Sequence, residues 1–125
     1  MIKTCKYEEI KHLKKNDDRE WASIEDGKKM TWFAKLEGDK VVGCVALRDI
    51  GKNKGRLNSI YVNSNSRKKG FGSDLVKNLL FFASMNGFEY VETNTTQGKL
   101  MIKNGFKPTG KKFGFGGFQY VWRKN

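Results

Sequence analysis

Apolar side chains recur at helical spacing in two parts of the chain. The first part lies within residues 6–26, and its apolar positions are Ile10, Leu13, Trp21 and Ile24. Charged residues surround them, so this part predicts one or two short amphipathic helices that stop at Asp26-Gly27. The second part begins near Gly72, ends at Asn86-Gly87, and carries an apolar face of Leu75, Val76, Leu79, Leu80, Phe82 and Ala83. It is the strongest helical signal in the sequence.

Between these two parts, short apolar runs alternate with turn residues. Residues 31–36, 41–47 and 56–62 are predicted to form strands, and the first two to pair as a hairpin. Turns are expected at residues 37–40 and 51–55, which combine glycine with charged side chains.

Short elements follow the long helix. The pattern predicts a strand over residues 88–92 and a helix over residues 95–103 that is closed by Asn104-Gly105. In the last region Phe118, Tyr120 and Trp122 alternate on one face of a strand. The order of helix, antiparallel strands, helix, strand, helix and strands predicts a mixed sheet with helices packed on it. A chain of 125 residues suffices for one domain over residues 1–125.

Composition excludes several classes of protein. The chain is 38% hydrophobic and 13% aromatic, which is enough to fold. It contains no apolar run near the roughly 20 residues that span a bilayer, and its N-terminus lacks the apolar core of a signal peptide. Cys5 and Cys44 provide neither a disulfide framework nor a metal cluster. We therefore expect a cytoplasmic protein with reduced thiols and no metal.

The charge is unevenly distributed. The formal net charge is +12, and residues 67–125 contribute +8 of it from eleven basic and three acidic side chains. Residues 1–30 contribute only +1. Such a field attracts anions, which include a phosphorylated cofactor, an acidic protein and a nucleic acid. Solubility alone is the alternative explanation of the charge.

One loop has the composition of a phosphate site. Residues 67–72 read Arg-Lys-Lys-Gly-Phe-Gly and lie between a predicted strand and the strongest helix. Glycines allow close approach of the backbone, and the unpaired amides and the dipole of a helix start favour an anion. A basic, glycine-rich helix entry without a ligand is the alternative.

In this context the chain resembles the GNAT superfamily of N-acetyltransferases. Ile60-Tyr61-Val62, four intervening residues and then the 67–72 loop resemble the central motif of that family. A second signature, in which an Asn precedes a short helix that ends in Gly-Phe, is matched by Asn94, Gln97, Met101 and Gly105-Phe106. The resemblance covers about residues 31–122. It implies an α/β (α+β) fold with a mainly antiparallel central sheet of about six to seven strands and helices on both faces.

The resemblance also implies a cosubstrate, acetyl-CoA or a close acyl-CoA. The loop amides would hold its pyrophosphate, and the preceding strand would hold its pantetheine arm. The implied cofactor-binding residues are Ile60, Tyr61, Val62, Arg67, Lys68, Lys69, Gly70, Phe71, Gly72, Ser73, Asn94 and Met101. The acyl carbonyl would lie where the parallel strands 56–62 and 88–92 splay apart.

Two positions depart from the family pattern. Met101 stands where the family often has a tyrosine that protonates the CoA thiolate, and a methionine has no proton to donate. The stretch 56–59 has no carboxylate where the family often has a glutamate base. The remaining candidates are Glu92 as the base, Asn94 to orient water or cofactor, and Tyr61, with Tyr90 and Tyr120, as an acid. The alternatives are a solvated strand carboxylate, a helix N-cap and core aromatic residues.

The acceptor is left open by the sequence. Like-charge repulsion argues against polyamines and aminoglycosides, and favours an amine on an acidic or nucleic-acid-associated partner. Viral GNAT-like proteins that modify DNA bases are similar in their basic charge and divergent catalytic residues. Residues 113–118 form either an acceptor-binding loop with stacking aromatics or a glycine hairpin whose phenylalanines lie in the core. Other possibilities are a non-catalytic acyl-CoA or nucleic-acid binding module, and a monomer or a homodimer.

Overall fold

The computed structural model describes residues 1–16, 24, 26–114 and 116–124. Within them, seven strands form one sheet in the order β1-β2-β3-β4-β5-β7-β6. The strands are β1 Ile2–Cys5, β2 Met30–Glu37, β3 Lys40–Gly51, β4 Lys54–Val62, β5 Tyr90–Thr95, β6 Lys107–Phe113 and β7 Gly117–Arg123. The helices are α1 Tyr7–Ile10, α2 Phe71–Met85 and α3 Gly98–Lys103, with 3-10 turns η1 Lys11–Asn16 and η2 Ser64–Ser66. The pair β4·β5 is parallel and the other pairs are antiparallel, which confirms the predicted fold class.

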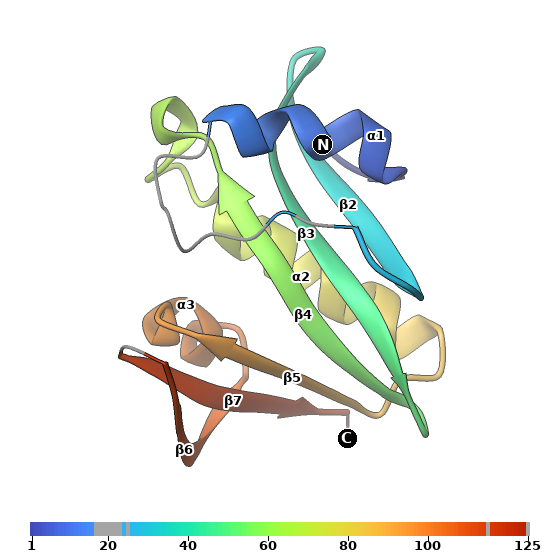
Figure 1. Cartoon of the computed structure of the whole chain (residues 1–125), viewed down its shortest axis with the longest axis vertical. Coiled ribbons are helices and arrows are strands. Elements are labelled where there is room, and N and C mark those ends of the chain that lie inside the picture. The colour runs from blue at the N-terminus through green and yellow to red at the C-terminus, as the bar shows by residue number, and fades with distance from the viewer. Residues whose placement is uncertain (17–23, 25, 115, 125) are drawn as a thin grey trace.

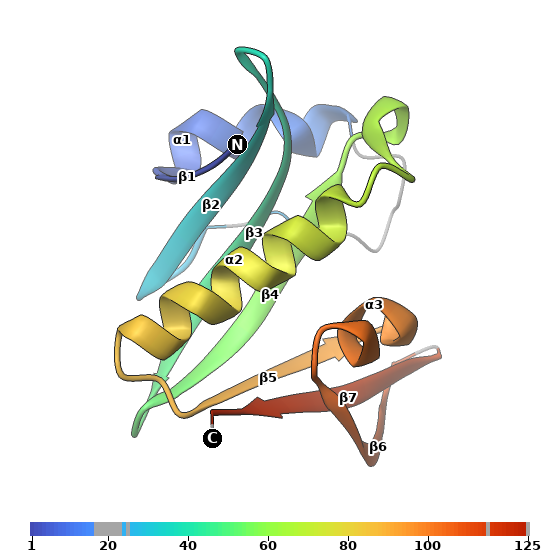
Figure 2. The same cartoon turned by 180° about the vertical axis from the view of Figure 1, so that it is seen from behind.

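The helices cover the two faces of the sheet unequally. α2 and α3 lie on one face, and α1 with η1 lies on the other (Figures 1 and 2). The core under α2 joins its apolar face to sheet residues such as Phe33, Leu57 and Val91. A second core packs Ile10 and Leu13 against Trp32 and Tyr61 of β2 and β4. The second core is the smaller, and none of the helices in the described residues packs on the rest of that sheet face.

The N-terminal elements differ from the prediction. In the described part of residues 6–26, where one or two short helices were predicted, the chain forms a four-residue helix, α1, and the 3-10 turn η1. Ile10 and Leu13 are fully buried, so two short turns suffice to bring the apolar positions to the sheet. Trp21 lies outside the described residues, and Ile24 is buried without belonging to a helix. Strand β1 was not predicted, because its four residues gain their order from pairing with β2.

Strand boundaries also differ from those predicted. The turn expected at residues 51–55 contains only Lys52 and Asn53, both at positive φ, so β3 and β4 extend to either side of a two-residue loop. β5 runs to Thr95 because its last residues pair with β7, and α3 therefore begins at Gly98 instead of 95. Asn94 is thus a strand residue and not a helix N-cap. Long-range pairing outweighs the local helical signal here.

The glycine-rich segment near the C-terminus connects β6 to β7, which confirms the hairpin interpretation. Phe113 and Phe118 are each 39% exposed, however, so these two phenylalanines do not lie in the core as that interpretation expected. The expected alternation of Phe118, Tyr120 and Trp122 is confirmed, since their partners on β5 are Thr95, Thr93 and Val91, every second residue of that strand.

Gly98→Ala is expected to destabilise the fold by about 2 kcal/mol, the usual cost of overpacking. A methyl group at position 98 would overlap the hydroxyl of buried Tyr120 and lie 2.9 Å from its Cζ. Thermal unfolding should show a melting temperature lower by about 8 °C for a domain of this size. Gly72→Ala is the matched control, because its methyl group would meet only Leu100 at 3.6 Å. Equal melting temperatures for the two variants would contradict this account of the packing.

Candidate active site

The strands β4 and β5 separate after a short parallel ladder. Only three residue pairs join them, and the last is Arg56 with Glu92. Beyond it, the Thr93 hydroxyl donates a hydrogen bond of 3.1 Å to the carbonyl of Leu57. β4 then continues to Val62 and β5 to Thr95 without further pairing between them. The expected splay between two parallel strands is therefore confirmed.

A β-bulge lies in β4 at this splay. Cys44 pairs with Tyr61 and Ala46 with Asn58, so two residues of β4, Ser59 and Ile60, lie opposite one residue of β3. Ser59 adopts a φ of 58°, a left-handed conformation that is uncommon for a residue other than glycine. Bulges leave backbone groups unpaired and re-aim side chains, often next to active sites.

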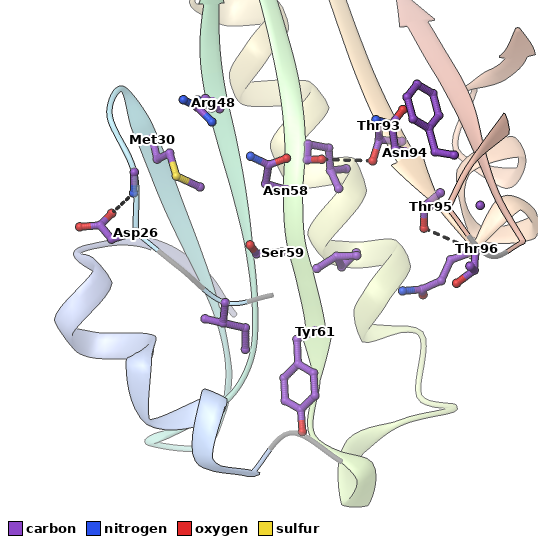
Figure 3. A pocket seen from close by; sticks show the side chains of 18 residues that line it. Asp26, Met30, Arg48, Asn58, Ser59, Tyr61, Thr93, Asn94, Thr95 and Thr96 are labelled. Atoms are coloured by element: carbon purple, nitrogen blue, oxygen red, sulfur yellow. Dashed lines mark hydrogen bonds between the residues drawn. The ribbon is translucent and has the colours of Figure 1, made fainter. Parts of the chain in front are cut away.

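A cavity of about 690 Å³ opens at the splay (Figure 3). Its walls come from β4, from β5 with the residues that follow it, from the β6–β7 hairpin, from Arg48 of β3 and from Ile24, Asp26, Gly27 and Met30. Its lining mixes apolar residues such as Ile24, Met30, Leu57 and Phe113 with neutral polar ones, which are Asn58, Ser59, Thr93, Asn94, Thr95, Thr96 and Gln97. Its charged lining residues are Asp26 and Arg48. Asp26 Oδ1 accepts hydrogen bonds from the Gly27 amide at 3.0 Å and from Trp32 Nε1 at 3.3 Å.

A second cavity of about 270 Å³ adjoins the first and shares Ile60, Tyr61 and Gln97 with it. It lies at the N-terminus of α2, and its charged lining residues are Arg67, Lys68 and Lys103. The two cavities are therefore neighbours, one at the helix start and the other at the splay.

The start of α2 has the geometry of an anion site. The first-turn amides of a helix have no intrahelical acceptor, and no side chain caps this one. Lys68 and the N-cap Gly70 have φ of 65° and 82°, a backbone shape that turns successive amides toward one concavity. A methyl group at Gly70 would meet nothing within 4 Å, so the backbone is open on the ligand side. The positive end of the 15-residue helix adds to the attraction for a phosphate. These residues fit a diphosphate group such as that of CoA.

The three basic residues of the loop have different neighbours. Arg67 Nε donates to the carbonyl of Val62 at 2.8 Å, and its guanidinium lies 5.5 Å from the ring centre of Tyr61. Lys69 instead bonds Glu37 Oε2 at 2.9 Å, and this bond holds the pKa of the Glu37 carboxyl below its usual value. Lys69 is thus directed toward β2, while Arg67 and Lys68 line the cavity.

Most of the predicted cofactor-binding residues meet at the smaller cavity. Those that line it are Ile60, Tyr61, Val62, Arg67, Lys68, Gly70, Phe71, Gly72 and Ser73. Asn94 lines the larger cavity. Lys69 and Met101 line neither, and Met101 is fully buried in the core under α2. A role in cofactor binding stays a prediction for all of these residues, and the cavities support it for all except Lys69 and Met101.

The predicted catalytic residues are only partly brought together. Tyr61 lines both cavities and is 2% exposed, while Asn94 is exposed and lines the larger one. Glu92 lines neither cavity, and its Oε2 accepts two hydrogen bonds from Arg56, from Nη2 at 2.8 Å and from Nε at 3.2 Å. On its strand it lies two residues before Asn94, on the same face of the sheet.

The other two candidate tyrosines, Tyr90 and Tyr120, lie away from the cavities. Burial raises the pKa of Tyr90, and the neighbouring Glu92 carboxylate adds to the effect, so the Tyr90 phenol stays protonated. The Tyr120 hydroxyl packs against Gly98 in the core. Neither residue lines the described cavities.

The sequence did not assign a role to several lining residues. Gln97 belonged to a recognised motif but received no role, and Asp26 was interpreted as part of a helix stop. Arg48 and Lys103 carry no local signal of a site.

Within the described residues, no three metal-ligating side chains gather, and the longest helix, α2, is too short to cross a bilayer.

Residues 2–106 of the chain match the model of the acetyltransferase (GNAT) family. Among curated proteins, the uncharacterized N-acetyltransferase YsnE of Bacillus subtilis (strain 168) is 27% identical over 94 residues. The match covers 75% of this chain and 59% of YsnE, so the chain spans less than two thirds of the length of that relative.

Solved structures share the fold across almost the whole chain. Rv2747 of Mycobacterium tuberculosis, in complex with CoA and NLQ, has a TM-score of 0.83 at 14% identity, covering 100% of this chain and 99% of that one. A Bacillus subtilis acetyltransferase in complex with CoA has a TM-score of 0.79 at 19% identity, with coverage of 99% and 98%. The IAA acetyltransferase of Bacillus cereus ATCC 14579 has a TM-score of 0.79 at 17% identity, with coverage of 99% of each chain. With a family match over most of its length, this chain belongs to the acetyltransferase (GNAT) family.

Proposed function

We propose that the protein is an acetyl-CoA-dependent N-acetyltransferase whose acceptor is an amine on an acidic or nucleic-acid-associated partner. The observation that supports this most directly is the pair of adjoining cavities. One has the geometry of an anion site at the N-terminus of α2, and the other, at the β4–β5 splay, has a lining of both polar and apolar side chains. A cosubstrate with a diphosphate at one end and a thioester at the other matches that arrangement.

The chain offers groups for each part of such a cosubstrate. The amides of Phe71, Gly72 and Ser73, with Arg67 and Lys68, would hold the diphosphate. Residues 59–62 of β4 would hold the pantetheine arm. Acetyl-CoA itself supplies an activated acyl carbonyl. Backbone amides that the bulge releases from the β3–β4 ladder would donate hydrogen bonds to the carbonyl oxygen as negative charge develops there.

The transfer forms a C–N bond, breaks the C–S bond and moves one proton from the amine to a base. Asn94 and Gln97 are placed to orient the amine or a water molecule in the larger cavity. Glu92 would act as the base through a water molecule. It lies two residues before Asn94 on β5 and on the same face of the sheet, and Asn94 lines the larger cavity. Tyr61, which lines both cavities, would protonate the leaving thiolate.

Addition of acetyl-CoA is expected to stabilise the protein in a thermal-shift titration. Ligand at about 100 times its dissociation constant adds about 2.7 kcal/mol to the free energy of unfolding. Release of free CoA in the presence of a panel of amines then tests for transfer. Absence of any shift at saturating acetyl-CoA would contradict the proposed cosubstrate.

A non-catalytic acyl-CoA binding module is the second candidate. Two observations favour it: Met101 is buried where the family often has its tyrosine acid, and the Glu92 carboxylate is occupied by Arg56. A thermal shift with acetyl-CoA but no CoA release with any amine, including nucleic-acid acceptors, would support this second candidate.

A further inference from the structure

The sheet face opposite α2 is open where it crosses β4, β5 and β7. Residues directly opposite each other on neighbouring strands share a face. The second core, with α1 and η1, covers this face only over β2, β3 and the Tyr61 end of β4. None of the described helices packs on the rest of it, which faces the viewer in Figure 1. We call one part of this surface the open face. Its residues are Arg48, Lys54, Arg56, Tyr90, Glu92, Lys107 and Arg123.

The pairing register arranges the open face in rows. Lys54, Tyr90 and Arg123 are direct partners across β4, β5 and β7 and form one row. The next row runs from Arg48 through Arg56 and Glu92 to Val121 and Lys107. Beyond this row, Asn94 and Gln119 are direct partners on β5 and β7, and Asn94 lines the larger cavity together with Asn58, the next residue of β4 on this face. The open face therefore leads directly into that cavity.

The charge of the open face is strongly positive. It carries five basic side chains, and its one carboxylate, Glu92, accepts two hydrogen bonds from Arg56. Lys54, Lys107, Arg123 and Arg48 are all exposed to solvent. Such a surface is complementary to a partner with repeated negative charges.

Aromatic side chains accompany these cations. Tyr90 lies between Lys54 Nζ and Arg123 Cζ, which are 5.2 Å and 4.9 Å from its ring centre. Phe113, which is 39% exposed, lies at the edge of the larger cavity. Cations contact phosphates, and an exposed ring stacks on a base, whereas an acidic peptide uses the cations alone. The combination favours a nucleic acid over an acidic protein.

We propose that the open face binds a single strand of nucleic acid, with its phosphates on Lys54, Arg123 and Arg48 and one base at the larger cavity beside Phe113. A single strand is favoured because a base in a duplex is stacked and paired, and reaches an enclosed site only after it leaves the stack. The assignment of that base as the acceptor rests on the proposed function. Strand binding itself requires no acetyl-CoA.

The test measures fluorescence anisotropy of a labelled, mixed-sequence single strand of about 12 nucleotides, without acetyl-CoA. The logarithm of the binding constant should fall linearly with the logarithm of salt concentration, by about 0.7 for each phosphate contact. Lys54→Gln/Arg123→Gln should bind about tenfold more weakly and reduce the slope by about 1.4. Phe113→Ala should weaken binding about tenfold without changing the slope, because a stacked base carries no charge.

Lys77→Gln/Lys99→Gln is the matched control. It removes the same charge from exposed positions on α2 and α3, on the other face of the sheet, and should change binding by less than about twofold. Equal weakening by both pairs of substitutions would overturn the assignment to the open face. A poly-glutamate peptide or a blunt duplex that binds as tightly as the single strand would overturn the assignment of the partner.

The strand assay also separates this inference from the proposed function. Gly72→Glu alters the acetyl-CoA cavity on the far side of β4 and should leave strand affinity within about threefold. Strand binding without CoA release would contradict the proposed activity and support the open face. Transfer to a small amine without strand binding would support the proposed activity and contradict the open face as a binding site for a strand.

Discussion

Gly72→Glu is expected to abolish acetyl-CoA binding while the protein remains folded. Gly72 lies in the first turn of α2 and lines the smaller cavity, and a methyl group added at its Cα would meet only Leu100. A carboxylate there would occupy the position that favours a phosphate. Two like charges about 4 Å apart near a protein surface repel by about 4 kcal/mol. Affinity for acetyl-CoA should therefore fall by a factor of the order of 100 to 1,000.

Isothermal titration of acetyl-CoA measures this loss, and thermal unfolding without ligand verifies the fold. Gly72→Ala reports the effect of the added side chain on folding, because its methyl group fits. Lys77→Gln makes the same unit change in charge at an exposed site farther along α2, and should leave acetyl-CoA affinity within about threefold. Tight acetyl-CoA binding by a folded Gly72→Glu protein would place the diphosphate somewhere other than the start of α2.

The anion site was the most predictable part of the molecule. Its loop, the strand before it and the helix after it are contiguous in sequence, so most of the residues that line the smaller cavity belong to the pattern at residues 60–72. α2 was predicted within about one residue because its apolar face has an unambiguous period. Signals that act over one turn or one loop are readable without knowledge of the rest of the fold.

The larger cavity was not predictable in the same way. Its walls come from five separate parts of the chain, and Asp26 and Arg48 meet there only because β2 and β3 pair. The end of β5 was misplaced for the same reason, since pairing with β7 decides it. Met101 shows the limit of a motif: it matches the family position in sequence, yet the face of α3 that carries it packs into the core.

Glu92→Gln is expected to lower kcat about 100-fold while acetyl-CoA still stabilises the protein to the same degree, because general-base catalysis contributes about 10² to 10⁴ in rate. The amide can still accept a hydrogen bond from Arg56, so the junction of β4 and β5 is preserved. It cannot take a proton from the amine. The measurement is the rate of CoA release at saturating acetyl-CoA with the best amine acceptor.

Arg56→Gln separates catalysis from structure. It keeps the carboxylate but removes the ion pair, whose arginine side chain is 38% exposed and which therefore contributes at most about 1 kcal/mol to stability. We expect this variant to retain turnover within about tenfold of the original protein. Parallel losses of stability and turnover in both variants would instead show that Glu92 anchors the strands at the splay. The proton would then leave the amine through a water molecule held by Asn58 and Asn94, the next residues on the same face.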